Sequence, residues 1–303
     1  GTILVTGSNG FIGKNLIKHL EGESIITCDY GEADVEPHAL LEFIETHKIG
    51  TIIHLGAISS TTETDIKKLR NVNVGLTLKL FNWCVRNNIP LIYASSAATY
   101  GDGSNGYEDT ESLEYLRNLK PLNAYGQSKA DADTEIFSQI DPTITPQVVA
   151  LKFFNVYGPH ESHKGEMRSV ARKLYDSLKC GQAAKLFKSY KDEYEDGAQL
   201  RDFIYVKDCC DVIKYFLNTP ISGIFNVGTG KARTFKAVAE SVFAALNLPP
   251  VITYIDMPPN IRPHYQYFTE ANTTKLRLMG YDKPFTSLED GVKEYVNSLE
   301  IGL

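Results

Sequence analysis

Cysteine is scarce in this 303-residue chain, and the five that occur are not spaced for a disulfide framework or a zinc site. None belongs to a CxxC pair; they are Cys28, Cys84, Cys180, Cys209 and Cys210. An uninterrupted run of about 18 apolar residues, as a membrane span needs, is also missing, and no charged and then apolar signal segment opens the chain. We therefore expect a protein of the reducing cytoplasm without a membrane partner.

Positive charge is not in excess either. Lys and Arg number 31 against 37 Asp and Glu, which gives a formal net charge of −6 and a pI near 5.7. This balance excludes a chain built mainly to neutralise nucleic-acid phosphates. The seven histidines show no metal-ligand spacing, so no metal is expected. His54 lies in an apolar stretch and is expected to be a hydrogen-bonded core residue.

The rest of the composition is that of an ordinary globular protein, with 43% hydrophobic and 22% charged residues. At about 150 residues per domain, the length predicts two domains or one large α/β domain with an added lobe. Tryptophan occurs once and tyrosine 17 times. Most of these tyrosines are expected to pack or to face solvent, so a chemical role has to be argued for a particular one.

Three glycines follow the first apolar run at the spacing of a dinucleotide-binding loop. Thr2–Thr6 predicts a strand, and Gly7, Gly10 and Gly13 come directly after it, before a helical pattern. In this context Gly7 permits a tight turn, Gly10 lets backbone N–H groups approach a pyrophosphate, and Gly13 lets the helix pack on the strand. The helix N-terminus would add a partial positive charge. The alternative is a tight β–α turn without a ligand.

Asp29 stands 22 residues after Gly7, at the end of the next expected strand, Ser24–Cys28. A carboxylate at that position can accept both ribose hydroxyls of an adenosine, although a turn cap is the alternative. No Arg or Lys follows closely, so the local chemistry favours NAD over NADP. Only a few residues then precede the next helical pattern, whereas a doubly wound sheet usually has a crossover and a third strand here. We therefore expect that a segment is missing after Tyr30.

Strand and helix patterns alternate through the first half. Thr51–Leu55 and Pro90–Ala94 predict buried strands, and a helix is expected over Val74–Val85. After the first of these strands come small residues that would allow a cofactor to approach, or that simply pack as a turn: Gly56, Ala57, Ile58, Ser59 and Ser60. The alternation predicts an α/β fold, a Rossmann-type doubly wound parallel sheet with a smaller interleaved C-terminal substrate lobe.

We expect residues 1–160 to form the dinucleotide-binding domain. Residues 161–303 are expected to form mainly the substrate lobe, with a segment of about 201–230 returning to the first domain. Met167–Lys179 predicts an amphipathic core helix, and the polar stretch Ser189–Gln199 predicts a solvated loop. Arg201 suits a diphosphate, because guanidinium forks match phosphate oxygens; an ion pair with Asp202 or Asp208 is the alternative.

Tyr125 and Lys129 lie four residues apart in an expected helix and therefore share one face. A phenol is a poor base at pH 7, and a neighbouring ammonium together with a cationic nicotinamide would lower its pKa. Ser96 follows an expected strand and could hydrogen-bond the same substrate oxygen. The three residues predict that serine orients the substrate, tyrosine moves a proton, and lysine tunes the tyrosine; an ordinary helix face is the alternative.

This order of motifs resembles the extended short-chain dehydrogenase/reductase superfamily, which carries GxxGxxG, a strand-end Ser or Thr, and YxxxK. Within it the chain is most similar to ADP-L-glycero-D-manno-heptose 6-epimerases. The segments that carry the similarity span nearly the whole chain: Ser59–Glu63, Tyr93–Gly101, Phe153–Pro159, His163–Gly165, Arg201–Val206, Gly223–Gly230 and Tyr281–Phe285.

The resemblance implies roles for individual residues. Tyr125 matches the catalytic tyrosine, Lys129 the motif lysine, and Lys164 a second acid–base. Positions matching the nucleotide-cofactor site are Phe11, Ile12, Asp29, Gly56 to Ser60, Asn73, Lys129, Val156 and Lys164. Positions matching the ADP-sugar site are Asn155, Glu166, Lys173, Phe187, Arg201 and Tyr265. The resemblance also implies NADP as cofactor, in contrast to the chemistry around Asp29, and a homo-oligomer.

The residues after Ser96 narrow the reaction. Dehydratases of this superfamily have an acidic pair there, because elimination of water needs a proton donor for the leaving hydroxyl. Ala97 and Ala98 donate no proton. The resemblance implies epimerisation at carbon 6 of ADP-heptose, by oxidation to a ketone and return of the hydride, in the synthesis of lipopolysaccharide precursor. A UDP-sugar 4-epimerase and a dinucleotide-sensing protein without turnover are the alternatives.

Overall fold

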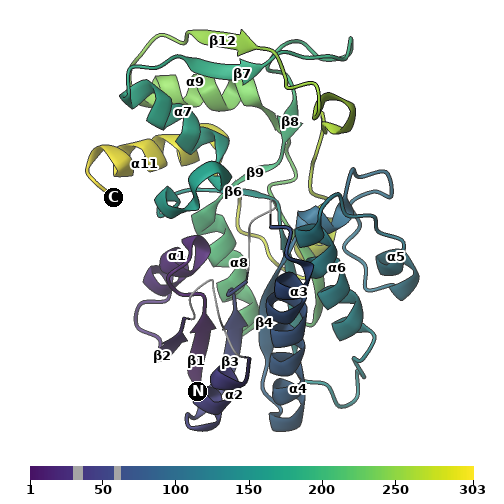
Figure 1. Cartoon of the computed structure of the whole chain (residues 1–303). Helices are drawn as coiled ribbons and strands as arrows, with labels where there is room; N and C mark the ends of the chain where they lie inside the picture. Colours follow the sequence, from purple (N-terminus) through teal and green to yellow (C-terminus); the bar gives the residue numbers. More distant parts are fainter. Residues whose placement is uncertain (30–36, 58–62) are drawn as a thin grey trace. The chain divides into compact units, whose positions relative to one another are not determined.

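The computed structural model describes residues 1–29, 37–57 and 63–303, drawn as a coloured ribbon in Figure 1. The chain forms two compact units, each assembled from three separate segments. Unit 1 comprises residues 1–153, 210–227 and 274–281, and unit 2 comprises residues 154–209, 228–273 and 282–303. The prediction that a segment is missing after Tyr30 falls on residues that lie outside the described ranges.

Unit 1 contains a six-stranded parallel sheet, which confirms the predicted fold class. Its strands lie in the order β10-β5-β4-β3-β1-β2, so that β1 pairs with β3 on one side and β2 on the other, as Figure 1 shows. Their bounds are Thr2–Thr6 (β1), Ile25–Cys28 (β2), Ile49–His54 (β3), Leu91–Ser96 (β4), Val148–Phe153 (β5) and Gly223–Val227 (β10). Every residue of β5 is buried, as expected for an inner strand covered on both faces, and every residue of the edge strand β10 is buried as well.

The helices of unit 1 include one clear difference from the prediction. The helix expected to begin at Val74 begins at Ile66, and its second part, Arg70–Leu76 (η1), is π-helical. The first turns carry mostly exposed polar residues, so they lack the apolar period on which the prediction depends. The other helical bounds are Phe11–His19 (α1), Pro37–Glu45 (α2), Ile66–Leu69 (α3), Thr77–Asn87 (α4), Ala97–Tyr100 (η2), Leu113–Arg117 (α5), Ala124–Phe137 (α6) and Thr274–Leu278 (α10).

His54 is a hydrogen-bonded core residue, as predicted. Its Nδ1 lies 2.6 Å from Thr6 Oγ1 and its Nε2 lies 3.3 Å from Thr77 Oγ1. Burial and the neighbouring charge of Lys129 lower the pKa of His54 to about 3, so the ring stays neutral at physiological pH. The five cysteines are all free thiols. Of the helices in the described part of the chain, none is long and apolar enough to cross a membrane.

Unit 2 consists of short strand pairs and helices packed on one apolar core. Strand β7 pairs with β12, β6 with β9, and β8 with β11. The bounds are Asn155–Tyr157 (β6), Ser162–Met167 (η3), Val170–Lys179 (α7), Ala184–Phe187 (β7), Leu200–Arg201 (β8), Phe203–Tyr205 (β9), Arg233–Thr234 (β11), Phe235–Ala245 (α9), Ile252–Ile255 (β12), Arg262–His264 (η4) and Leu288–Glu300 (α11). Helix α8 (Val206–Asn218) begins in unit 2 and continues in unit 1.

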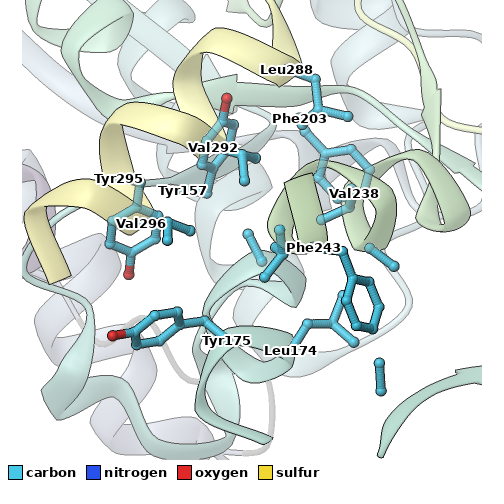
Figure 2. Packing of buried hydrophobic residues seen from close by; sticks show 14 of the residues in the cluster. Tyr157, Leu174, Tyr175, Phe203, Val238, Phe243, Leu288, Val292, Tyr295 and Val296 are labelled. Atoms are coloured by element: carbon cyan, nitrogen blue, oxygen red, sulfur yellow. The ribbon is translucent and has the colours of Figure 1, made fainter. Parts of the chain in front are cut away.

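Helix α7 faces the core of unit 2, which confirms the prediction that it is a core helix. Figure 2 shows Leu174 and Tyr175 of α7 together with Val238 and Phe243 of α9, and Val292 of α11, in one cluster. The stretch 189–199 contains no helix or strand and is mainly exposed, as expected for a solvated loop.

Asp202 joins three separate segments of unit 2 through hydrogen bonds to its buried carboxylate. It accepts from Thr229 N and Oγ1, both at 2.8 Å, and from Gly230 N and Ala271 N, both at 3.0 Å. Asp202→Asn places an amide NH₂ opposite backbone N–H donors, and a buried donor without an acceptor costs about 1–3 kcal/mol. We expect the free energy of unfolding to fall by about 2 kcal/mol in a denaturant titration.

Asp192→Asn is the matched control, because Asp192 is exposed in the loop of residues 189–199. It should leave the unfolding midpoint within experimental error of the parent chain. An equal midpoint for Asp202→Asn would show that this carboxylate does not hold the three segments together.

Candidate active site

The glycine loop between β1 and α1 has the backbone geometry that a bound pyrophosphate requires. Gly7 has a φ of +69°, and Gly10 N donates to Gly7 O at 3.0 Å. A Cβ atom on Gly13 would lie 2.0 Å from Gly7 O, so only glycine lets α1 approach the loop this closely. Phe11 is buried and Ile12 half-buried at the first turn of α1, and the N-terminus of a helix favours anions. The loop therefore fits the phosphates of a dinucleotide.

Asp29 is held against the glycine loop. Its carboxylate accepts a hydrogen bond from Ser8 Oγ and one of 3.1 Å from Asn9 N, and the side chain remains exposed to solvent. Both partners belong to the loop itself, so Asp29 lies at the end of β2 beside the residues expected to bind phosphate. A carboxylate there can accept ribose hydroxyls.

The next strand also ends beside this loop. Gly56 N donates to Thr6 Oγ1 at 3.1 Å, which fixes the turn after β3 to the end of β1; Gly56 is buried and Ala57 half-buried. The carboxyl ends of parallel strands at this point are where such folds bind nucleotides. The predicted cofactor residues Ile58, Ser59 and Ser60 lie outside the described residues.

Ser96, Tyr125 and Lys129, here called the serine–tyrosine–lysine group, are brought together in unit 1. Ser96 is the last residue of β4 and its Oγ accepts from Ala98 N at 3.0 Å. Tyr125 and Lys129 lie one turn apart on α6, and the phenol makes a side-chain hydrogen bond with Ser96. Lys129 is 5% exposed, and its Nζ donates to Ala94 O at 2.9 Å. The end of β4 and helix α6 therefore meet at this group.

The electrostatics of this group differ from the expectation for Tyr125. Burial raises the pKa of the phenol, the nearby Asp133 carboxylate raises it further, and the hydrogen bond with Ser96 opposes both effects. Burial lowers the pKa of Lys129 to about 8, against the attraction of Asp133. The ammonium form of Lys129 therefore predominates at pH 7. The protein residues by themselves therefore do not lower the pKa of Tyr125 as expected.

Asn73 contacts α6, the helix that carries Tyr125 and Lys129. It is buried within the π-helical turn η1, and its Nδ2 donates to Ser128 Oγ at 3.0 Å. Ser128 Oγ in turn donates to Tyr125 O at 2.7 Å. The wider π turn, which often occurs at functional sites, places Asn73 against the helix that carries Tyr125 and Lys129.

Two charged residues next to this group were missed at the level of sequence. Asp133 and Lys152 are fully buried, and their charged atoms lie 3.7 Å apart. The available signals were the position of Asp133, four residues after Lys129, and a single lysine inside the otherwise apolar strand β5. Glu161 was also missed: it is buried and accepts from Gly158 N, Ser169 N and Ser169 Oγ, which shapes the turn before Lys164.

Unit 2 brings together three residues that were predicted to hold the sugar nucleotide. The Arg201 guanidinium carbon lies 5.2 Å from the ring centroid of Tyr265 and 5.4 Å from that of Phe235. Phe187 meets Tyr265 edge to face, with 6.2 Å between ring centroids. We call Phe187, Arg201 and Tyr265 the arginine–aromatic group. The two carboxylates considered as ion-pair partners of Arg201 accept other hydrogen bonds, Asp202 as described above and Asp208 from Thr286.

The remaining predicted residues of unit 2 lie at its surface or near it. Asn155 is exposed and Val156 half-buried on β6. Lys164 is half-buried on η3; burial lowers its pKa, and Glu161 opposes that shift. Glu166 and Lys173 contact each other, with 3.8 Å between Oε2 and Nζ, and Glu166 is almost fully exposed. An exposed pair of this kind contributes little stability.

No group of three or more metal-ligand side chains occurs among the residues that the structure places. Arg262 stacks on Tyr190, with 4.2 Å from its guanidinium carbon to the ring centroid.

The chain is similar to proteins of one family along most of its length. The NAD dependent epimerase/dehydratase family matches residues 3–228. An ADP-L-glycero-D-manno-heptose-6-epimerase of Fusobacterium nucleatum is 49% identical over 257 residues, covering 82% of this chain and 77% of the relative. One of Nitratidesulfovibrio vulgaris is 42% identical over 317 aligned residues, covering 97% and 96%. The crystal structure of the Helicobacter pylori ADP-L-glycero-D-manno-heptose-6-epimerase superposes with a TM-score of 0.82 at 26% identity, covering 99% and 96%.

Proposed function

Because the chain belongs to the NAD dependent epimerase/dehydratase family, we propose that it interconverts ADP-D-glycero-D-manno-heptose and ADP-L-glycero-D-manno-heptose at carbon 6. The observation that carries the proposal is the hydrogen bond between Ser96 and Tyr125, with Lys129 one turn further along α6. The names of relatives that are 42–49% identical support the substrate. The product would serve the synthesis of lipopolysaccharide precursor, as the resemblance implies.

The serine–tyrosine–lysine group supplies the proton chemistry of this reaction. When bound, a nicotinamide dinucleotide supplies a hydride acceptor and donor. Ser96 orients the hydroxyl at carbon 6 by a hydrogen bond, and Tyr125 takes its proton while the C6–H bond breaks and a ketone forms. Before it accepts this proton Tyr125 is a phenolate, and the Lys129 ammonium stabilises its negative charge. Return of the hydride to the opposite face of the planar ketone, with return of the proton, inverts the centre without net oxidation.

Lys164 is proposed as the second acid–base. The resemblance implies this role, and burial lowers the pKa of its amine, which brings the amine closer to the range where it can give and take a proton. Tyr125 and Lys164 would then each serve one of the two stereoisomers.

The residues after Ser96 support epimerisation over dehydration. Ala97 and Ala98 form the first turn of η2, directly at the strand end, and Ala98 N donates to Ser96 Oγ. A dehydratase needs an acid here to protonate the leaving hydroxyl. Methyl groups at both positions provide none.

The arginine–aromatic group supports a nucleotide diphosphate as the constant part of the substrate. Arg201 is held by two aromatic rings, so its guanidinium fork is pre-oriented for phosphate oxygens. Phe187 and Tyr265 offer aromatic surface to a base or a sugar. Asn155, Glu166 and Lys173 complete the proposed contacts with the ADP-sugar.

The glycine loop fits a nicotinamide dinucleotide, and the proposed further cofactor contacts are Asp29, Asn73, Val156 and Lys164. The resemblance implies NADP. The exposed Asp29 carboxylate supports NAD, because a 2′-phosphate beside it would be repelled. The mass of the dinucleotide released from the purified chain decides between them, since NADP is heavier by one phosphate.

The proposed reaction predicts the fate of hydrogen at carbon 6. The hydride leaves and returns within one active site, so the chain incubated with ADP-D-glycero-D-manno-heptose in D₂O should give the L-epimer without deuterium at carbon 6. Proton NMR of the sugar measures both configuration and label. Deuterium at carbon 6 would contradict transient oxidation.

Two alternatives are separated by the same assay. Turnover of UDP-galactose with no turnover of the ADP-heptoses would indicate a UDP-sugar 4-epimerase. Dinucleotide binding with turnover of neither sugar would indicate a sensing protein. The free thiols support a reducing compartment such as the cytoplasm, and a homo-oligomer, implied by the resemblance, is measurable by analytical ultracentrifugation.

Arg201→Lys tests the arginine–aromatic group. Lysine keeps the charge but loses the planar fork and its stacking between Phe235 and Tyr265. We expect KM for the ADP-sugar to rise about tenfold, corresponding to about 1.4 kcal/mol, with kcat nearly unchanged. Lys236→Arg, on the exposed side of α9, is the control and should change neither constant. An unchanged KM in Arg201→Lys would remove Arg201 from the substrate site.

A further inference from the structure

A buried charged network lies entirely within unit 1, next to the serine–tyrosine–lysine group. Asp133 and Lys152 have no exposed surface, and Oδ2 of Asp133 lies 3.7 Å from Nζ of Lys152. The same carboxylate accepts hydrogen bonds of 2.7 Å from the Tyr93 hydroxyl and 2.6 Å from Ser95 Oγ. A buried ion pair is seldom worth more to stability than apolar side chains of similar size. Its presence therefore suggests a role other than holding the fold.

The helix side of this network faces the catalytic pair. Tyr125, Lys129 and Asp133 are spaced by four residues along α6, and residues four apart lie one above another on a helix face. Lys129 and Asp133 are both buried, so the carboxylate acts on the amine through a medium that screens charge poorly.

The strand side of the network reaches Ser96. Lys152 Nζ donates to Thr99 Oγ1 at 2.8 Å, and Thr99 Oγ1 donates to the backbone carbonyl of Ser96 at 2.9 Å. Ser95, the neighbour of Ser96 on β4, donates directly to Asp133. Ser95 is therefore bonded to the Asp133–Lys152 pair directly, and Ser96 is bonded to it through Thr99.

We propose that Asp133 is a positioning residue: its buried carboxylate, one turn from Lys129 on α6, supplies the counter-charge to the lysine ammonium and, through Ser95, Lys152 and Thr99, holds Ser96 against Tyr125. This role rests on the proposed function of the serine–tyrosine–lysine group. Asp133 would touch neither substrate nor cofactor and would act through the residues that do.

The other titratable groups around Lys129 do not supply a negative charge that could stabilise its ammonium form. On β3, His54 is neutral, because burial and Lys129 hold its pKa near 3. On β4, burial and Asp133 raise the pKa of Tyr93 well above its usual value, so this phenol is also neutral. On β5, Lys152 cannot supply a negative charge in either protonation state. Among these groups and Tyr125, within the described part of unit 1, Asp133 supplies the negative charge that counteracts the effect of burial on the pKa of Lys129.

The test is Asp133→Asn in the full-length chain, which keeps the size of the side chain and removes its charge. Lysine labelled with ¹³C at Cε is followed by NMR through a pH titration, and the Lys129 signal is assigned by its loss in Lys129→Met. We expect the Lys129 ionisation midpoint to fall by about one pH unit relative to the parent chain. This readout needs no substrate, so it stands even if the proposed epimerisation fails.

A second readout is the pH dependence of epimerisation. Removing a negative charge favours the deprotonated form of every neighbouring group, so the pKa values of Tyr125 and Lys129 should fall together. The whole pH–rate profile of Asp133→Asn should therefore move to lower pH, whereas a merely structural defect would lower its height without moving it. Asp131→Asn is the matched control: Asp131 lies on the same helix but binds Arg70 at the surface, and its loss should move neither profile nor midpoint.

Asp133→Asn leaves Lys152 buried without a counter-ion and could prevent folding. In that case Asp133→Asn/Lys152→Met, which removes both buried charges, is measured in the same way; we expect a smaller shift in the same direction, because Asp133 is the group that acts on Lys129. An unchanged Lys129 midpoint in the folded variant would overturn the proposal. A shifted midpoint without epimerase activity of the parent chain would instead contradict the proposed function alone.

Discussion

Tyr125→Phe should abolish most of the epimerase activity while leaving the fold intact. The substitution removes only the hydroxyl that bonds Ser96, and a positioned acid–base contributes about 10²–10⁴-fold to a rate. We expect kcat to fall by about 10³-fold, with KM nearly unchanged, in the NMR assay of the C6 epimers. The released dinucleotide should remain at the parent level, since the glycine loop is untouched.

Tyr215→Phe is the matched control for this substitution. Tyr215 lies on α8, and its hydroxyl donates to Met279 O at a site apart from the serine–tyrosine–lysine group. Its loss should leave kcat unchanged. Parent-level kcat in Tyr125→Phe would contradict the proposed proton transfer, and loss of the folded state in both variants would point to packing.

Gly13→Ala is expected to have the second-largest effect, on dinucleotide binding. The added Cβ would lie 2.0 Å from Gly7 O and 2.8 Å from Ser8 Cα, and backbone atoms cannot turn aside as a flexible side chain can. The loop must open, so its N–H groups no longer converge on a pyrophosphate. We expect the dinucleotide dissociation constant to rise by about 10²-fold, measured by calorimetry, and the free energy of unfolding to fall by about 1–3 kcal/mol.

Gly75→Ala is the control for Gly13→Ala. Gly75 also lies in a helical segment, η1, but its Cβ would meet only Arg70 O at 3.5 Å, an ordinary contact. Binding and stability should both stay close to those of the parent chain. If Gly13→Ala bound the dinucleotide as tightly as the parent, the glycine loop would not be the phosphate site.

Local patterns predicted a large part of the fold. The strand Thr2–Thr6 forms as predicted, the strand expected over Pro90–Ala94 forms over Leu91–Ser96, and Tyr125 lies on a helix as expected. The helix predicted over Val74–Val85 is present, but it begins earlier, at Ile66, because its first turns carry mostly exposed polar residues and show no apolar period. The segment expected to be missing after Tyr30, and three of the predicted cofactor residues, concern residues outside the described ranges.

The candidate site was predictable where residues close in sequence decide it. Glycine spacing, the four-residue step from Tyr125 to Lys129, and Ser96 at a strand end are all local features, and the structure brings them together. The direction in which the pKa of Tyr125 shifts was not predictable, because the shift depends on burial and on Asp133. The contact of Phe187, Arg201 and Tyr265 joins three distant segments of unit 2.

The sequence by itself determined the α/β class, the glycine loop and the chemical types of the proposed catalytic residues, since helix and strand periods and turn residues act over a few positions. Only the tertiary structure decided which buried polar residues meet. It places Lys152, the single lysine of β5, against Asp133, and a neutral His54 near Lys129. The physical reason is that burial and charge pairing depend on which strands and helices pack together.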